Sequence, residues 1–339
     1  MSGKRIYIAY TGGTIGMREG PQGFAPAAGF FEAQMRQMPE LLAPQMPAFD
    51  VVEYSPLLDS ADMSPDDWLR IARDVQAHYD DYDGFVVVHG TDTMAYTASA
   101  LSFMLEGLAK PVVLTGSQIP LCETRNDARN NLITALEVAA NHAVPEVTLC
   151  FGDALMRGCR ARKVDASGLA AFASPNFPPL GHIGSRIEID QSRVRRPESG
   201  ATLRVQAIGG PHVGALRLFP GLRASVLENM LSAPLEGLVL EAFGVGNGPK
   251  HDQQFLDVLR AGCERGIVVV VVTQCLRGRV DLSGYATGEA LASAGVVSGV
   301  DMTPEAALAK LHYLLNRGLE LDEVRRLIGV DLRGELSAG

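Results

Sequence analysis

The feature of this sequence that most constrains its fold is a series of short, continuously apolar runs. They occupy residues 5–10, 84–89, 111–115 and 147–151. Most of these runs do not alternate with polar residues, which is typical of parallel strands that are covered on both faces. A mostly parallel sheet with helices packed against it is therefore expected.

Helical patterns lie between these runs. Ser64 and Pro65 are typical of an N-cap and a first helical residue, and apolar residues follow them at helical spacing. Further helices are expected over about residues 93–107 and 126–141. Strands that alternate with helices in this way indicate an α/β protein.

A polar, arginine-rich segment interrupts the alternation at about residues 185–210. Strand-like runs return at residues 213–218, 237–241 and 267–273. With 339 residues, the chain is long enough for two domains that each bury a hydrophobic core. We expect a larger N-terminal α/β domain over residues 1–190, a linker over 191–210 and a smaller C-terminal α/β domain over 211–339.

The overall charge and hydropathy exclude several classes of protein. A formal net charge of -9 and a pI of about 5.3 argue against a nucleic-acid partner, because such proteins usually carry a basic surface. No apolar run approaches the roughly 20 residues that span a bilayer. The first apolar run, residues 6–9, is too short for the core of a signal peptide. We therefore expect a cytoplasmic protein without membrane or nucleic-acid partners.

The cysteines predict neither disulfides nor a metal site. Their number is odd and no pair has C-x-x-C spacing, which favours reduced thiols in a reducing compartment. Ligand spacing for zinc is also missing, so we expect no metal and no cofactor. The five are Cys122, Cys150, Cys159, Cys263 and Cys275.

Two of the expected strands end in glycine turns that carry hydroxyl groups. In T-G-G-T-I-G, at residues 11–16, two glycines allow a sharp turn and leave Thr14 at the end of the strand. In H-G-T-D-T, at residues 89–93, a buried strand is again followed by glycine, a hydroxyl and a carboxylate. Since sites in open parallel sheets lie at the carboxyl ends of strands, both turns are candidates for a functional site.

Taken singly, each of these residues also has a simpler interpretation. A Gly-Gly-Thr turn can bind phosphate or be purely structural. Thr91 or Asp92 can cap a helix. A threonine nucleophile needs a base, a cation or oxyanion donors, and Lys163 could assist if it lies beside Thr91, but alone it is a typical surface charge. His89 is expected to satisfy a local hydrogen bond and not to act as a general base.

Taken together, the motifs identify a family. In chain order they are T-G-G-T-I-G at 11–16, D-S-A-D-M at 59–63, H-G-T-D-T-M-A-Y-T-A at 89–98, T-G-S-Q-I-P at 115–120, R-K-V-D-A at 162–166, G-V-G-N-G at 244–248 and G-Y-A-T-G at 284–288. In the order and spacing of these motifs, the chain resembles the bacterial L-asparaginases, specifically the cytoplasmic type I branch. The resemblance extends over essentially the whole chain.

This resemblance implies a fold, an activity and an assembly. The fold is a larger N-terminal α/β domain with a smaller C-terminal one. The activity is hydrolysis of L-asparagine to L-aspartate and ammonia, without a cofactor. The assembly is a homodimer or homotetramer in which a neighbouring C-terminal domain completes each site, and Asn247 matches the residue that the neighbour contributes.

The resemblance also implies roles for individual residues. Thr14 would be the nucleophile and would form an acyl-enzyme with the side-chain carbonyl of asparagine. Thr91 with Lys163 would position or activate a nucleophile or water. For the substrate's head group, Asp92 would bind the α-ammonium, and Ser60 with the adjacent Asp59 would hold the α-carboxylate.

Several positions depart from the family's pattern. Phe24 stands where the family usually has a tyrosine on a mobile loop, so a proton-handling hydroxyl is missing and turnover is expected to fall unless a group such as Tyr285 substitutes. Ala61 removes one possible polar contact to the substrate. Arg162 and Glu241 occupy positions that match a second, regulatory asparagine site in some type I enzymes. Because both change charge and could pair with each other, we predict hyperbolic kinetics.

Three alternatives remain open. One is mixed glutaminase–asparaginase activity, since one methylene usually discriminates by only about 1–3 kcal/mol. Another is a sensing protein that binds asparagine with little or no hydrolysis, which Phe24 favours. The intact Thr14, Thr91, Asp92 and Lys163 argue against it, because a pure binder does not need a lysine beside two hydroxyls. The third is a dinucleotide-binding enzyme, but the first turn lacks the full G-x-G-x-x-G pattern.

Overall fold

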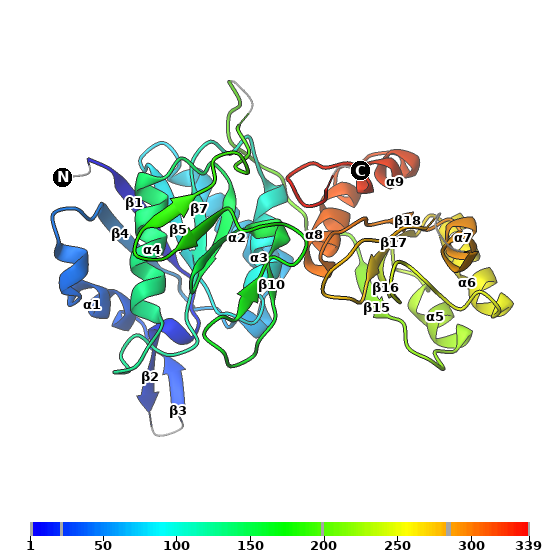
Figure 1. The fold of residues 1–339 in the computed structure, drawn as a ribbon, viewed down its shortest axis with the longest axis horizontal. Coiled ribbons are helices and arrows are strands. Elements are labelled where there is room, and N and C mark those ends of the chain that lie inside the picture. The colour runs from blue at the N-terminus through cyan, green and yellow to red at the C-terminus, as the bar shows by residue number, and fades with distance from the viewer. Residues whose placement is uncertain (1–2, 21–22, 198–199, 283–285, 338–339) are drawn as a thin grey trace. The chain divides into compact units, whose positions relative to one another are not determined.

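The structure is a computed structural model that describes residues 3–20, 23–197, 200–282 and 286–337 (Figure 1). It consists of two compact units, each described below by itself. The first comprises Met1–Ser174 and Pro178–Gln206, and the second comprises Pro175–Phe177 and Ala207–Gly339. The chain thus passes briefly into the second unit before it returns to complete the first.

The first unit is built on an eight-stranded sheet. From β4 to β8 the neighbouring strands are parallel, and β9, β12 and β13 extend the sheet with antiparallel pairs. Across the sheet the strands are β13 (Ile187–Ile189), β12 (Gly181–Ile183), β9 (Ala154–Arg157), β8 (Val147–Phe151), β7 (Val112–Thr115), β5 (Gly84–Val88), β1 (Arg5–Tyr10) and β4 (Ala48–Glu53).

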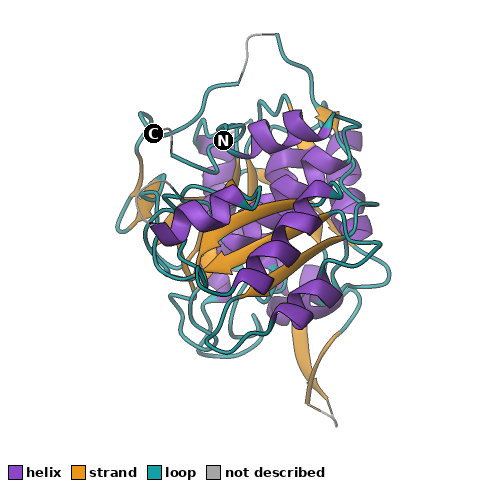
Figure 2. Ribbon diagram, turned by 90° about the vertical axis from the view of Figure 1, so that its right-hand side faces the viewer, coloured by secondary structure: helices purple, strands orange, loops and turns teal. Residues whose placement is uncertain are grey.

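Helices cover this sheet because its central strands are apolar on both faces. Figure 2 distinguishes the helices, strands and loops of the chain by colour. Every residue of β5 and β8 is buried. Helix α4 (Ala128–Asn141) packs on β1, β5, β7 and β8, while α3 (Met94–Met104) packs on β7 and β8. Helix α2 (Pro65–Ala77) begins with the capping box of Ser64 and Asp67 and packs on α3, and the short α1 (Phe30–Arg36) lies near the N-terminus.

Shorter elements connect and extend this framework. The strand pairs are β2 (Met17–Gly20) with β3 (Gly23–Pro26), β10 (Arg162–Lys163) with β11 (Phe172–Ala173), and β6 (Leu105–Glu106) with β14 (Arg204–Val205). The 3-10 turns are η1 (Thr14–Gly16), η2 (Pro39–Leu42), η3 (Ser60–Asp62) and η4 (Gly158–Arg160).

The second unit is a four-stranded parallel sheet in the order β15 (Val213–Arg217), β16 (Gly237–Ala242), β17 (Val268–Thr273) and β18 (Val297–Ser298). Its helices are α5 (Ala224–Met230), α6 (Gln253–Glu264), α7 (Ala286–Ser293), α8 (Pro304–Leu315) and α9 (Leu321–Ile328). Helix α6 packs against α5 and α7, and α8 packs on β15 and β16 with α9 beside it. The predicted fold class, a larger N-terminal parallel-sheet unit and a smaller C-terminal α/β unit, is confirmed.

The polar segment at residues 185–210 differs from the simple connection that its sequence predicts. It contains β13 and β14, which pair with β12 and β6 of the first unit. Polar side chains do not prevent such pairing, because the ladder is made by the backbone. The division between the two units, after Gln206, falls inside this segment.

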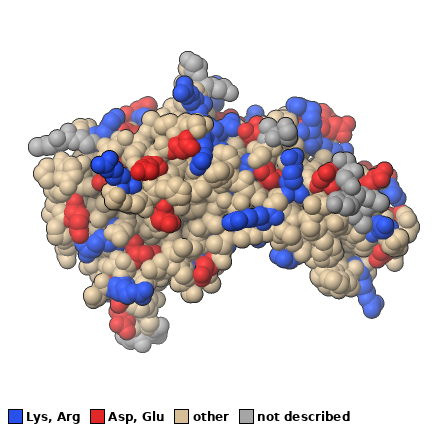
Figure 3. Space-filling model, in the orientation of Figure 1, with Lys and Arg blue, Asp and Glu red and all other residues tan. Residues whose placement is uncertain are grey.

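The surface carries both signs of charge. On the face drawn in Figure 3, lysine and arginine side chains are interspersed with aspartate and glutamate in each unit. No continuous basic stripe of the kind that binds nucleic acid is visible there. Within the part of the chain that the structure describes, no helix combines the length and the apolar character needed to cross a membrane.

Candidate active site

Three loops meet at the carboxyl end of the first unit's sheet, beyond β1 and β5. The turn after β1 is anchored by Thr11, whose backbone N–H and hydroxyl each donate to Val88 O at 3.0 Å. Gly12 and Gly13 follow with φ angles of 135° and 94°, which side chains other than glycine rarely adopt. Thr11 O in turn accepts from Leu58 N at 2.7 Å, which connects this turn to the loop that precedes η3.

Glycines make the close contacts between these loops possible. A Cβ atom on Gly13 would lie 2.6 Å from the Cα of Gly90, which is closer than real Cβ atoms approach. A Cβ atom on Gly90 would overlap the side chain of Ser60. Because both positions are glycine, the loops that carry Thr14, Ser60 and Thr91 pack directly on one another, and the structure brings these three predicted residues to one place.

Thr14 and Ser60 each begin a 3-10 turn at this place. Thr14 is half-buried at the start of η1, whereas Ser60, at the start of η3, is only 5% exposed. The carboxylate of Asp59 accepts from Ala61 N at 2.9 Å, and Thr93 donates to the carbonyl of Ser60 at 2.7 Å. The Asp59 side chain is exposed, so it remains accessible to a ligand.

Lys163 connects the two predicted residues of the second turn. Its Nζ atom lies 2.9 Å from Thr91 Oγ1 and 2.6 Å from Asp92 Oδ1. The lysine side chain is 18% exposed and Thr91 is buried, whereas the Asp92 side chain is 68% exposed. The interpretation of Lys163 as a surface charge is therefore wrong. A carboxylate has two oxygens, so Asp92 can bind Lys163 and still accept from a ligand's ammonium group.

Gln118 is a member of this cluster to which the sequence assigned no role. Its side chain accepts the Thr91 hydroxyl at 3.2 Å and donates to the carbonyls of Ala166 and Gly168, also at 3.2 Å. The T-G-S-Q-I-P motif contains this glutamine. Its partners lie 27 to 50 residues away, however, so only the folded chain reveals them.

His89 satisfies hydrogen bonds behind the second turn, as its sequence context predicts. It is 1% exposed, with Nδ1 2.7 Å from Gly90 O and Nε2 2.9 Å from Thr97 Oγ1. Trp68 donates to that same hydroxyl at 3.0 Å. The Gly90 carbonyl can only accept, so Nδ1 carries the proton and the neutral ring accepts from Thr97. Burial lowers the pKa of His89 to about 4.

Phe24 lies in the β2–β3 hairpin, opposite Glu19. The residue is 46% exposed, although a phenyl side chain gains stability by burial. Figure 1 shows this hairpin extending from the body of the first unit. Tyr285, the other residue considered for proton handling, lies outside the described residues.

Three residues of interest occupy other positions. Arg162 pairs with Ala173 in the β10–β11 ladder, directly before Lys163. Glu241 belongs to the second unit, where its carboxylate lies 3.5 Å from Arg217. Asn247 is also in the second unit, and its backbone exchanges hydrogen bonds with Phe243 at 2.8 and 3.0 Å.

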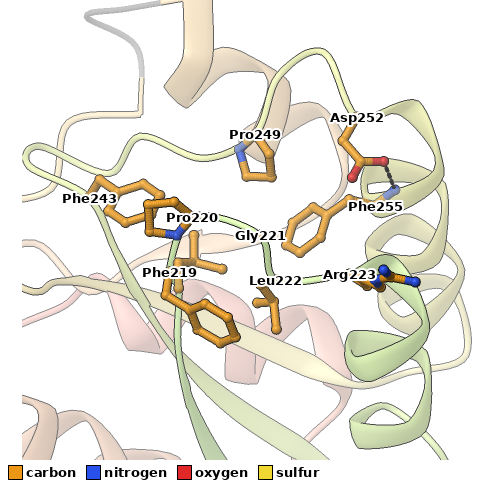
Figure 4. Close-up of a pocket in the computed structure, with 10 residues that line it drawn as sticks. Phe219, Pro220, Gly221, Leu222, Arg223, Phe243, Pro249, Asp252 and Phe255 are labelled. Carbon is orange, nitrogen blue, oxygen red and sulfur yellow. Dashed lines mark hydrogen bonds between the residues drawn. The ribbon is translucent and has the colours of Figure 1, made fainter.

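The second unit also has a largely apolar pocket of about 480 Å³ (Figure 4). Phe219, Phe243 and Phe255 line it, and Asp252 at its edge accepts the backbone N–H of Phe255 at 2.9 Å. None of the predicted site residues contributes to it. Among the described residues there is also no group of three or more His, Cys, Asp or Glu side chains that could hold a metal ion.

The fold and the cluster define a class of protein: a two-unit α/β protein with a lysine–hydroxyl–carboxylate cluster at the carboxyl edge of its larger sheet. Family models agree with this description. The model for "Asparaginase, N-terminal" matches residues 5–195, and that for "Glutaminase/Asparaginase C-terminal domain" matches residues 212–328. The chain belongs to the asparaginase family.

Individual relatives cover the chain from end to end. L-asparaginase 1 of Escherichia coli strain K12 is 52% identical over 337 residues, which cover 99% of each chain. L-asparaginase I of Vibrio cholerae O1 biovar eltor has a similar structure, with a TM-score of 0.92 and 51% identity over 99% of each chain. The thermostable L-asparaginase of Thermococcus kodakarensis gives a TM-score of 0.89 at 35% identity, covering 99% of this chain and 100% of the other.

The buried His89 predicts an acid-sensitive stability. Its pKa is about 4 in the folded protein and about 6.5 when unfolded, so below pH 6.5 the unfolded chain binds a proton that the folded chain does not. Burying a neutral His89 therefore costs no unfolding free energy above pH 6.5. As the pH falls from 6.5 towards 4, the folded protein becomes progressively less stable relative to the unfolded chain. Between about pH 7 and pH 5, the wild type should lose about 2 kcal/mol more unfolding free energy than His89→Gln.

Urea unfolding followed by the fluorescence of Trp68 provides the measurement. Trp68 is the single tryptophan of the chain and donates to the hydroxyl of Thr97, which in turn donates to His89, so its signal reports on the first unit. The substituted glutamine amide can still donate and accept but does not titrate. Equal acid sensitivity in the two proteins would show that His89 titrates normally.

Proposed function

We propose that this protein is an L-asparaginase that hydrolyses L-asparagine to L-aspartate and ammonia through a threonine acyl-enzyme. The observation that carries the proposal is the lysine–hydroxyl–carboxylate cluster, in which Lys163 Nζ lies 2.9 Å from Thr91 and 2.6 Å from Asp92. It lies at the carboxyl edge of the sheet, beside the turn that carries Thr14. Full-length similarity to proteins named L-asparaginase supports the same activity.

In the proposed reaction, the Thr14 hydroxyl attacks the side-chain amide carbon of asparagine. Its proton passes to the amide nitrogen by way of neighbouring groups, the C–N bond breaks, and ammonia leaves an ester on Thr14. Water then attacks the ester carbon, which releases aspartate and returns the proton to Thr14. A threonine hydroxyl is a weak nucleophile at neutral pH, so this route requires a nearby acid–base group.

Thr91 and Lys163 are proposed to supply that group. Only 18% of the lysine side chain is exposed, so its charge interacts strongly with the neighbouring oxygens. A hydroxyl hydrogen-bonded to an amine is a short path along which a proton can move. General acid–base help of this kind is typically worth about 10²–10⁴-fold in rate.

The substrate's head group requires complementary charges, and the loops offer them. The exposed Asp92 carboxylate is proposed to bind the α-ammonium. Ser60, with the adjacent Asp59, is proposed to hold the α-carboxylate through hydroxyl and backbone donors, because a carboxylate side chain alone would repel it. The distance between the bound head group and Thr14 would then determine which length of substrate side chain places its amide carbon at the Thr14 hydroxyl.

We further propose a cytoplasmic homodimer or homotetramer in which Asn247 of a neighbouring subunit completes the site. Asn247 matches the family motif, and the connection between Phe243 and Asn247 holds its loop in a defined conformation. The five cysteines are free thiols, which agrees with the reducing conditions of the cytoplasm.

Replacement of the proposed nucleophile tests the activity directly. Thr14→Ala should reduce ammonia release from L-asparagine by roughly 10³-fold or more, because the covalent route is lost. Thr14→Ser, which keeps a hydroxyl, is the matched control and should retain measurable turnover. The assay compares L-asparagine with L-glutamine for all three proteins.

The outcomes of this assay distinguish the proposed mechanism from the alternative functions. Asparagine turnover that survives in Thr14→Ala would reject Thr14 as the nucleophile. Comparable rates with glutamine would indicate a glutaminase–asparaginase. No turnover by the wild type, with asparagine still bound in calorimetry, would indicate a sensing protein.

Phe24 is predicted to limit the rate. Phe24→Tyr should raise kcat, because it supplies a hydroxyl to the hairpin beside the Thr14 turn, with the roughly 10²–10⁴-fold of general acid–base catalysis as the upper bound. Phe24→Leu keeps an apolar side chain without a hydroxyl and should leave kcat nearly unchanged. An unchanged or lower kcat in Phe24→Tyr would show that Phe24 has only a packing role. Tyr285→Phe tests separately whether the hydroxyl of Tyr285 replaces the missing one.

Saturation with asparagine is predicted to be hyperbolic. Arg162 and Glu241 place opposite charges at positions that match a regulatory site in some relatives, and Glu241 already lies 3.5 Å from Arg217. Initial rates over a wide range of asparagine concentrations provide the measurement. A Hill coefficient clearly above one would contradict the prediction.

A further inference from the structure

The loop that carries Gln118 is unusually well fixed. The backbone N–H groups of Gln118 and Ile119 donate to the two carboxylate oxygens of Asp127, each at 3.0 Å. Asn131, which is 3% exposed, donates to Gly116 O at 2.9 Å. Asp127 and Asn131 belong to the start of α4, so a rigid helix holds the backbone from which the Gln118 side chain extends.

The partners of the Gln118 amide determine its orientation. One end lies 3.2 Å from the carbonyl oxygens of both Ala166 and Gly168, which can only accept hydrogen bonds. That end must therefore be the NH₂ group. The loop that presents these carbonyls is itself fixed, because Asp165 accepts from the backbone N–H of Ser167 and of Gly168 at 2.8 Å.

The direction of the neighbouring bonds follows. The other end of the amide is an oxygen, 3.2 Å from Thr91 Oγ1, so the Thr91 hydroxyl must donate to it. A hydroxyl has a single hydrogen, so Thr91 must accept from its other neighbour. Lys163 therefore donates to Thr91 at 2.9 Å, and the bonds run in one direction from Lys163 through Thr91 to Gln118.

We propose that Gln118 is a positioning residue that fixes both the Lys163 loop and the direction of the proton on Thr91. This inference rests on the proposed function and deepens it. While the Thr91–Gln118 bond is intact, Thr91 accepts from Lys163 and its own hydrogen points to Gln118. Thr91 can give its proton to Lys163 only after the bond to Gln118 breaks.

Two substitutions separate this role from simple packing, because they remove different bonds of the amide. Gln118→Met removes all of them, so the Thr91 hydrogen loses its acceptor and the Lys163 loop loses the donor to its carbonyls. Gln118→Glu keeps an acceptor for Thr91 and loses only the NH₂ group that binds Ala166 and Gly168.

The first readout does not depend on turnover. Hydrogen–deuterium exchange followed by mass spectrometry reports how firmly the loop over residues 163–168 is held. Exchange there should become faster in both variants than in the wild type, because both lose the donor to Ala166 and Gly168. Gln253→Met, which alters an exposed glutamine of the second unit, is the control and should leave this exchange unchanged.

The second readout is steady-state kinetics with L-asparagine. Gln118→Met should lower kcat by roughly 10-fold or more, a fraction of what acid–base catalysis supplies, with a smaller change in KM. Gln118→Glu, which keeps the acceptor for Thr91, should recover much of that kcat although its loop is also released. Equal kcat in the two variants, or exchange that neither variant changes, would overturn the role of Gln118. A wild type that does not hydrolyse asparagine would reject the proposed function instead, while the exchange would still decide whether Gln118 holds the Lys163 loop.

Discussion

A partly desolvated ammonium group is the interaction around which the first unit's cluster is arranged. Lys163 keeps less than a fifth of its side chain exposed, and a charge in that environment is stable only if oxygen atoms replace its water. Thr91 and Asp92 supply two such oxygens from a single turn. The proposed chemistry, the direction of the hydrogen bonds and the role of Gln118 all depend on where that one nitrogen atom lies.

The parallel sheet provides the framework that this arrangement needs. Strands β1 and β5 are adjacent and parallel, so the turns that follow them emerge at the same edge. Gly13 and Gly90 then allow these turns to touch, which no residue with a Cβ atom at position 13 would permit. Two glycine turns that lie more than 70 residues apart in the chain thereby form one surface. The neutral, buried His89 supports it from behind through the carbonyl of Gly90.

The sequence predicts those parts of the structure that depend on local patterns. Strands β1 and β8 occupy the predicted residues, because a run that is apolar on both faces is stable only in a covered sheet. The short strands β13 and β14 were not predicted, since their pairing depends on distant backbone partners and not on their own side chains. Gln118 was missed for the same reason: its role follows from the orientation that its distant partners impose on its amide.

The position of Phe24 gives the Thr91–Lys163 pair more importance in the proposed mechanism. A hairpin that carries a phenyl ring can exclude water from a site, but it cannot carry a proton. Proton movement beside Thr14 must then depend on groups that the sheet already holds in place, and Lys163 is the amine that contacts the second turn. Because the Gln118 amide determines which atom of that pair donates, the rigid loop at the start of α4 would control the step that the hairpin does not assist.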